Sequence, residues 1–171
     1  MKPAELDKPS YIARVEKLMA DDENSEMMAK IRCYYRPEDT EDGRRPFHGE
    51  KEIFLSNDYD TQSTQTIQGK CVVHTFQKYI KLKDVGIDDY FCRYEYDAGK
   101  RDQPVAAGER FTPKRVTVYC KCNMPYNPEA YMVQCDKCKD WYHPSCLGLE
   151  IEDHEKLEEF VCSKCRMMMN N

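Results

Sequence analysis

Side chains that bind metal ions are concentrated in the last third of this 171-residue chain. They are seven cysteines and one histidine, in the order Cys120, Cys122, Cys135, Cys138, His143, Cys146, Cys162 and Cys165. A Cys-x-x-Cys pair places two thiolates on one tight turn, so each pair supplies half of a tetrahedral site. Such a cluster is typical of zinc in a reducing compartment and of disulfides in an oxidising one. We expect two zinc ions per chain.

The order and spacing of these ligands resemble a PHD finger, whose two zinc ions are held in a cross-brace. The resemblance assigns one set to the first zinc, Cys120, Cys122, His143 and Cys146, and the other to the second, Cys135, Cys138, Cys162 and Cys165. Both sets are complete, so the zinc ions implied are structural and not catalytic. A RING finger, which would indicate an E3 ubiquitin ligase, is the alternative. Trp141, two residues before His143, favours the PHD finger.

The same resemblance implies a cage for a methylated lysine of a histone H3 tail. A trimethylammonium ion donates no hydrogen bond and binds best over aromatic faces that exclude water. In PHD fingers that read methyl-lysine, the cage positions correspond here to Tyr119, Tyr126, Met132 and Trp141. Packing in the core of the finger is the alternative role for these side chains. The resemblance predicts a reader of H3 trimethylated at lysine 4.

Two acidic residues and one strand complete the site that the resemblance implies. Asp136 corresponds to the carboxylate that pairs with the second-residue arginine of the histone, and Asp140 is placed to assist it. Residues 131–135 are expected to form a strand whose edge pairs with the incoming tail.

The part of the chain before Val118 has the pattern of a mostly β domain. Short alternating or β-branched runs recur at 11–15, 30–35, 52–55, 71–76 and 90–96, separated by polar, glycine and proline residues. We therefore expect this domain over residues 1–117, a zinc finger over 118–166 and a tail over 167–171. Residues 97–110 are expected to form a loop, 151–160 a short helix, and 166–171 a frayed end.

Two motifs of the first domain carry a second resemblance. GRRPFHG at 43–49 and GKCVVHTF at 69–76 resemble a BAH domain, a β-rich module of chromatin proteins. The order of the two domains is similar to the plant BAH–PHD chromatin readers of the Early Bolting in Short Days and Short Life family. That family has a longer N-terminus, so the resemblance implies a BAH domain that lacks its N-terminal strand. It also implies a nuclear protein of transcriptional regulation and flowering control, which binds nucleosomes and recruits unknown chromatin factors.

The BAH domain of that family resembles a reader of H3 trimethylated at lysine 27, with a cage of two tyrosines and a tryptophan. The corresponding residues here are Tyr11, Cys33 and Tyr35. Cysteine lacks the π face and the area of tryptophan. We expect this cage to bind weakly or not at all.

Composition and motifs exclude several functions. The formal net charge of -5 argues against sequence-specific DNA binding, because proteins that neutralise DNA phosphates are usually basic. No apolar run approaches the roughly 20 residues of a membrane span. Neither a phosphate-binding glycine loop nor a nucleophile elbow is present. We therefore expect no enzymatic activity and no membrane partner.

Overall fold

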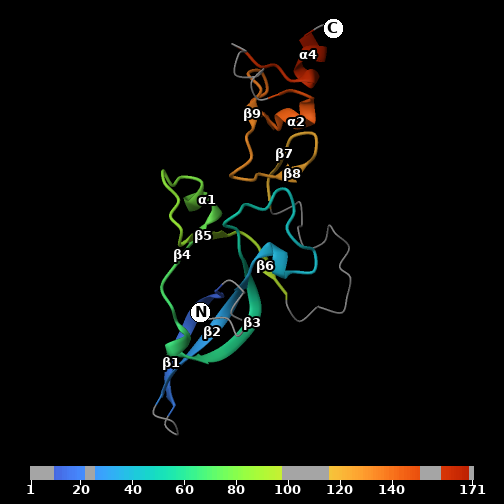
Figure 1. The fold of residues 1–171 in the computed structure, drawn as a ribbon. Coiled ribbons are helices and arrows are strands. Elements are labelled where there is room, and N and C mark those ends of the chain that lie inside the picture. The colour runs from blue at the N-terminus through green and yellow to red at the C-terminus, as the bar shows by residue number, and fades with distance from the viewer. Residues whose placement is uncertain (1–9, 22–25, 98–115, 151–158, 170–171) are drawn as a thin grey trace. The chain divides into compact units, whose positions relative to one another are not determined.

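The computed structural model describes residues 10–21, 26–97, 116–150 and 159–169 (Figure 1). The chain divides into two compact units, Met1–Ala107 and Gly108–Asn171. Most of the helix expected at 151–160, and nearly all of the loop expected at 97–110, lie outside the described residues. Across the described ranges, no helix is long and apolar enough to cross a membrane.

The first unit is built on a four-stranded sheet in the order β1-β2-β3-β6 (Figure 1). The strands are β1 (Ile12–Asp21), β2 (Glu26–Tyr35), β3 (Phe54–Ser63) and β6 (Glu95–Tyr96). The first three pair antiparallel, whereas β6 runs parallel to β3. In β2, buried Ala29 and Ile31 alternate with exposed Lys30, as expected for a strand with one covered face. The mostly β fold is therefore confirmed.

The two strands expected at 52–55 and 90–96 differ from those observed. β3 begins at Phe54 but continues to Ser63, because pairing with β2 carries a polar run that has no apolar alternation. The segment 90–96 is split into β5 (Asp89–Cys92) and β6, since Arg93 turns its guanidinium into the interior. β5 pairs parallel with β4 (Val72–Thr75).

Short helical turns connect these strands. They are η1 (Pro37–Asp39), η2 (Thr64–Thr66) and α1 (Phe76–Tyr79), the last of which directly follows β4. Tyr79 on α1 packs against Phe91 of β5, with ring centroids 4.4 Å apart. This contact fixes the small β4–β5 sheet to the helix that follows it.

A buried ion pair lies in the core of the first unit. Glu52 is fully buried and accepts from Arg93 through both carboxylate oxygens, Oε1 to Nε at 2.7 Å and Oε2 to Nη2 at 3.0 Å. The backbone N–H of Gly49 also donates to Oε2. The guanidinium stacks over Phe76, with Cζ 4.4 Å from the ring centroid. Burial raises the pKa of Glu52, and its three donors oppose that shift.

The second unit consists of two small antiparallel strand pairs and short helices. β7 (Val118–Tyr119) pairs with β8 (Met124–Pro125), and β9 (Val133–Gln134) pairs with β10 (Trp141–Tyr142). α2 (Pro144–Leu147) ends at Gly148, whose φ of 69° is readily adopted only by glycine. α4 (Ser163–Met169) is helical to Met169, so the frayed end expected from residue 166 is wrong over residues 166–169.

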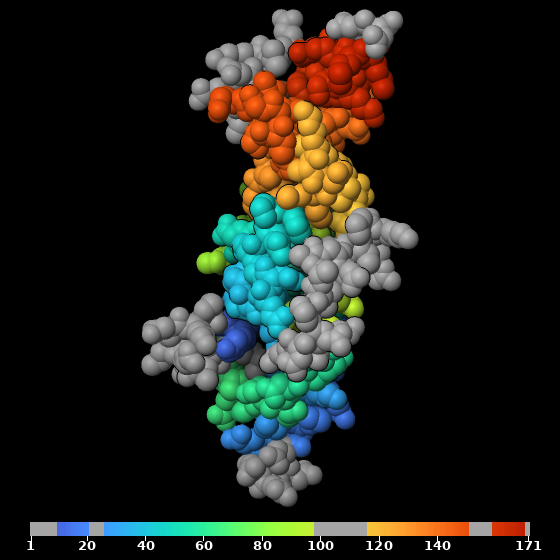
Figure 2. Space-filling model, turned by 90° about the vertical axis from the view of Figure 1, so that its right-hand side faces the viewer, coloured from blue at the N-terminus to red at the C-terminus, as the bar shows by residue number. Residues whose placement is uncertain are grey.

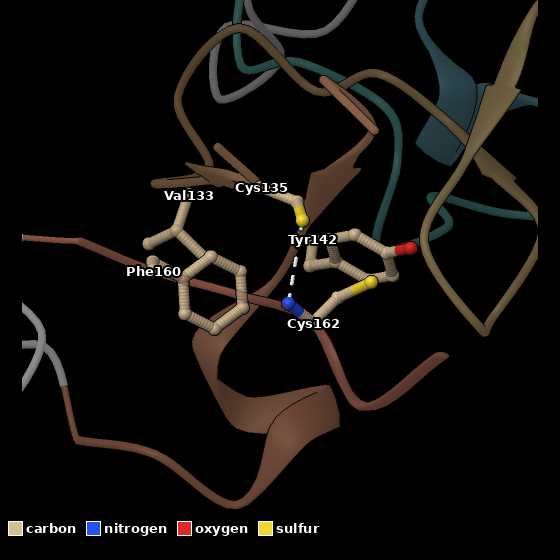
Figure 3. Close-up of a cluster of buried hydrophobic side chains, with 5 residues drawn as sticks. All are labelled: Val133, Cys135, Tyr142, Phe160 and Cys162. Atoms are coloured by element: carbon tan, nitrogen blue, oxygen red, sulfur yellow. Dashed lines mark hydrogen bonds between the residues drawn. The ribbon is translucent and has the colours of Figure 1, made fainter. Parts of the chain in front are cut away.

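The core of the second unit is small and includes two of the metal-binding cysteines. Its buried members, shown in Figure 3, are Val133, Cys135, Tyr142, Phe160 and Cys162. A core of this size stabilises a fold only weakly, and small domains of this kind depend on bound metal.

Candidate metal centres and binding site

The structure brings the eight predicted ligands together in two sets of four. Within each set, all ligand atoms lie within 4.8 Å of one another: Cys120, Cys122, His143 and Cys146 in one, and Cys135, Cys138, Cys162 and Cys165 in the other. This interleaved pairing is the predicted cross-brace. None of the ten cysteines of the chain forms a disulfide, so the disulfide alternative is wrong.

The spacing of the donor atoms fits zinc. A tetrahedral site with zinc–sulfur bonds of about 2.3 Å requires sulfurs about 3.8 Å apart. Cys138 Sγ and Cys162 Sγ are 3.9 Å apart, while His143 Nδ1 lies 3.5 Å from Cys122 Sγ and 3.9 Å from Cys146 Sγ. Four protein donors fill each site, so the two zinc ions of the finger are structural.

Backbone amides prepare two of the sulfurs for metal binding. Burial alone would raise the pKa of Cys120, but the N–H groups of His143 and Cys122 oppose this and lower it to about 6. Cys135 is likewise held at about 6, because N–H groups that include that of Cys162 outweigh the effect of burial. The N–H of Cys162 donates to Cys135 Sγ at 3.3 Å (Figure 3). The thiolate is the form that binds metal.

Sequence reasoning missed the backbone conformation that shapes these turns. Cys120, Asn123 and Lys139 adopt positive φ angles of 63°, 51° and 61°. A left-handed residue reverses the chain within one turn, which allows neighbouring cysteines to converge on one ion. Asn123 is the member of this set whose residue type signals the conformation, since asparagine tolerates it better than most residues.

Two of the four predicted cage residues line one cavity. Tyr119 of β7 and Trp141 of β10 bound an open hollow of about 210 Å³, together with Val118, Cys120, Asn123, Asp140 and Tyr142. The side chain of Trp141 is 41% exposed, which argues against a role in the core.

The other two predicted cage residues occupy different positions. Tyr126 packs edge-on against Tyr119, with centroids 6.3 Å apart, and therefore supports that ring from outside the cavity lining. Met132 is only 9% exposed and also lies outside the lining. The structure thus brings Tyr119 and Trp141 to the cavity, whereas Tyr126 and Met132 lie outside its lining.

Of the two predicted acidic residues, only Asp140 lines the cavity. Asp136 forms two hydrogen bonds with the backbone of Phe160, accepting through Oδ2 and donating through its own N–H, both at 2.8 Å. Its Oδ1 lies 3.8 Å from Lys139 Nζ. Asp136 therefore fixes the segment that leads into the second metal site, a role that sequence reasoning missed. Asp140, by contrast, lines the cavity beside Trp141.

β9 offers an edge on which a peptide can pair. Gln134 lies opposite Trp141, while the next residue, Cys135, donates its N–H to the carbonyl of Asp140 at 2.9 Å. Antiparallel residues alternate between hydrogen-bonded and non-hydrogen-bonded positions, so the N–H and C=O of Gln134 point away from β10. Within the described part of the chain, β10 is the sole ladder partner of β9.

The predicted cage residues of the BAH domain lie at the edge of the main sheet where β1 begins and β2 ends. Cys33 and Tyr35 are two residues apart on β2 and so share a face, and Tyr11, which is 50% exposed, immediately precedes β1. Tyr35 donates its hydroxyl to Asp58 Oδ2 at 2.9 Å, and its ring lies 5.1 Å from that of Tyr96. Burial raises the pKa of Cys33, which remains a neutral thiol at pH 7.

Comparison with known proteins gives a domain family for each unit. The BAH domain family model matches residues 1–103, and the UBR7-like PHD finger model matches residues 116–170. The finger is therefore a PHD finger, and the RING alternative is wrong.

Similar proteins come from plants and animals. The chain is 54% identical to the chromatin remodeling protein EBS of Arabidopsis thaliana, over 96% of this chain and 67% of that protein. It is 49% identical to the A. thaliana chromatin remodeling protein SHL, over all of this chain and 72% of that protein. Histone lysine demethylase PHF8 of Danio rerio is 38% identical over 30% of this chain and only 5% of its own length. Because it is about half identical to both plant proteins over at least 96% of its own length, this chain, with its BAH domain followed by a PHD finger, belongs to the family that includes EBS and SHL.

Proposed function

We propose that this protein is a nuclear chromatin reader whose PHD finger binds the H3 tail trimethylated at lysine 4. The observation that carries the proposal is the cavity lined by Tyr119, Trp141 and Asp140. Two aromatic faces attract a cation that cannot donate hydrogen bonds, and the carboxylate of Asp140 adds negative charge beside them. The names of EBS and SHL, both chromatin remodeling proteins, support a role in chromatin.

The edge of β9 supplies the second part of the recognition. A peptide paired with the outward N–H and C=O of Gln134 would lie beside Trp141, the residue opposite Gln134 in the ladder. Asp136 accepts the N–H of Phe160 through Oδ2, and its other carboxylate oxygen, Oδ1, would receive the second-residue arginine of the histone. Backbone pairing supplies affinity, and the cavity supplies selectivity for the methylated lysine.

Peptide titration of two variants tests the finger. Trp141→Ala removes the strongest cation–π face and should weaken binding of the lysine 4 trimethylated peptide by roughly 2 kcal/mol, about thirtyfold. Tyr59→Ala removes a comparably exposed aromatic from the other unit, outside both proposed cages, and serves as the matched control. Equal losses in the two variants would refute the assignment of the cavity.

The BAH domain is proposed as a weak reader of H3 trimethylated at lysine 27. Tyr35 is oriented by Asp58, but the neighbouring position on the same face is Cys33. Cys33→Trp would restore an aromatic wall and should strengthen binding of that peptide by about thirtyfold, or roughly 2 kcal/mol. Low-micromolar binding by the unmodified chain, with no gain in Cys33→Trp, would refute this placement of the cage.

In the proposed function, the protein acts by binding and not by catalysis. Both zinc ions have four protein ligands, which is typical of structural sites. Its partners would be nucleosomes and further chromatin factors that it recruits, in plant transcriptional regulation and the control of flowering. The demethylases among the similar proteins match only a small part of their own length.

A further inference from the structure

Four cations share one face of the β1–β2 hairpin. Arg14 lies directly opposite Arg32, and Lys17 lies directly opposite Lys30. Directly paired residues project to the same side of a sheet, and Arg32 and Lys30 are two positions apart on β2. We call these four residues the basic face. Strands β1 and β2 (blue) and part of β3 (green) lie at the surface in Figure 2.

A β-bulge is what places the fourth cation on this face. Arg14 and Lys17 are three residues apart, and in a regular strand they would point to opposite sides. The register between β1 and β2 shifts between Val15 and Lys17, so Glu16 is the additional residue. Lys17 is thereby returned to the side of Arg14.

Acidic residues neutralise little of the basic face. Glu16 Oε1 accepts from Arg14 at 2.6 Å, on a partly exposed surface. Within the described residues, no acidic side chain forms an ion pair with Lys17, Lys30 or Arg32. Like charges placed directly opposite each other destabilise a sheet. Glu26 projects to the same side of β2 as Lys30 but lies four residues away, at the start of the strand. Two pairs of like charges on one face indicate a surface complementary to an anionic partner.

The position of Tyr59 indicates which kind of anion the basic face would bind. It lies opposite Arg32 on β3, and its ring already carries Lys30 Nζ at 5.6 Å and Arg32 Cζ at 5.7 Å from the centroid. Proteins that bind single strands stack bases on open aromatic rings. Here the ring holds two cations in place, so the surface favours phosphates over unstacked bases.

We propose that the basic face binds the phosphate backbone of duplex DNA without reading its sequence. Cations two residues apart on a strand are about 6.7 Å apart, so the face presents a regular array of charges to a regular array of phosphates. Such contacts position a protein on DNA but carry no sequence information. This inference concerns a different surface from the proposed histone site, and it holds or fails independently of it. The net charge of -5 makes the interaction a weak one.

The test is a titration of the full-length chain with a short random-sequence DNA duplex over a range of salt. With three phosphates neutralised, affinity should fall about fortyfold between 50 and 200 mM salt. The double variant Lys17→Gln/Lys30→Gln should bind at least tenfold more weakly and show a shallower salt dependence. Lys78→Gln/Lys81→Gln removes the same charge from two exposed lysines of the same unit and should bind like the unmodified chain.

Three outcomes would overturn the proposal. One is an unmodified chain that does not bind duplex DNA at low salt, and another is an equal loss in the two double variants. The third is tighter binding of single-stranded RNA than of duplex DNA, which would assign the face to a different partner. Circular dichroism and an unchanged midpoint of denaturant unfolding establish that each variant is folded, so a loss of DNA binding reports the surface itself.

Discussion

Tyr119 and Trp141 belong to different strand pairs, β7 and β10, and yet they line the same cavity. The first metal site joins them. Cys120 follows Tyr119 directly, His143 lies two residues beyond Trp141, and the N–H of His143 donates to Cys120 Sγ at 3.4 Å. The geometry of the cavity therefore depends on the zinc ion that these two ligands share.

Removing zinc should abolish methyl-lysine binding together with the fold of the finger. The buried core of this unit is small, so the metals provide much of its folding free energy. Chelation should release two zinc ions per chain, measured with a metal-sensitive dye, and the lysine 4 peptide should no longer bind. A folded chain containing one zinc ion or none would contradict the two-site assignment.

Two substitutions of Asp136 separate its structural role from its proposed role in binding. Asp136→Ala leaves the partly buried backbone N–H of Phe160 without its acceptor. It should lower the free energy of unfolding of the finger by about 1–3 kcal/mol. Asp136→Asn keeps an oxygen acceptor but removes the charge. It should retain both zinc ions and stability while binding unmodified and methylated tails more weakly.

Full tail affinity in Asp136→Asn, measured by calorimetry, would show that the carboxylate acts only on the fold. In that case Asp140, which lines the cavity, would be the sole acidic residue of the two at the site.

The buried pair of Glu52 and Arg93 should dominate the stability of the BAH domain. Glu52→Gln leaves the guanidinium buried without a counter-charge, which should cost about 3–5 kcal/mol in chemical denaturation. Glu38→Gln breaks an exposed pair with Arg44 and should cost less than about 1 kcal/mol. If the two variants lost similar amounts of unfolding free energy, the buried pair would contribute no more to stability than the exposed one.

His48 should make the BAH domain less stable in mild acid. Its ring is buried, and its Nδ1 accepts the N–H of Arg45 at 3.0 Å. Burial first, and then Arg93, Arg44 and Arg45, lower its pKa to about 4. In the unfolded chain, where the pKa of His48 is about 6.5, the ring takes up a proton more readily than in the folded domain. The free energy of unfolding should therefore decrease as pH falls from about 6.5 towards 4.

His48→Asn retains an acceptor near the position of Nδ1 but does not titrate, so it isolates this effect. The unmodified chain should lose its stability advantage over the variant across that pH range in denaturant unfolding. Parallel pH profiles for the two proteins would exclude His48 as the cause.

The sequence predicted the metal sites well because ligand type and spacing are written directly in it. The structure groups the eight predicted ligands into the two predicted sets, since thiolates and imidazole at these intervals permit few other structures. The cage was harder to predict. Its residues were assigned by correspondence with a family, and the position of Met132 depends on packing that no spacing reveals.

Other features could not be predicted because partners distant in sequence determine them. β3 extends through a polar run by pairing with β2, and Arg93 interrupts a strand because Glu52 holds it in the interior. The carboxylate of Asp136 bonds the backbone of Phe160, which lies far along the chain. In each case, a contact across the fold overrides the local preference.

Trp141 is the only tryptophan of the chain, so its fluorescence reports the proposed cage directly and without mutation. The decisive measurement is a fluorescence titration of the full-length chain with H3 peptides that are unmodified or trimethylated at lysine 4. A cation placed over the indole should change its emission, saturating at a concentration on the order of micromolar, and the unmodified peptide should produce a much smaller change. Identical responses to the two peptides, or binding of the trimethylated peptide with no change in emission, would contradict the account.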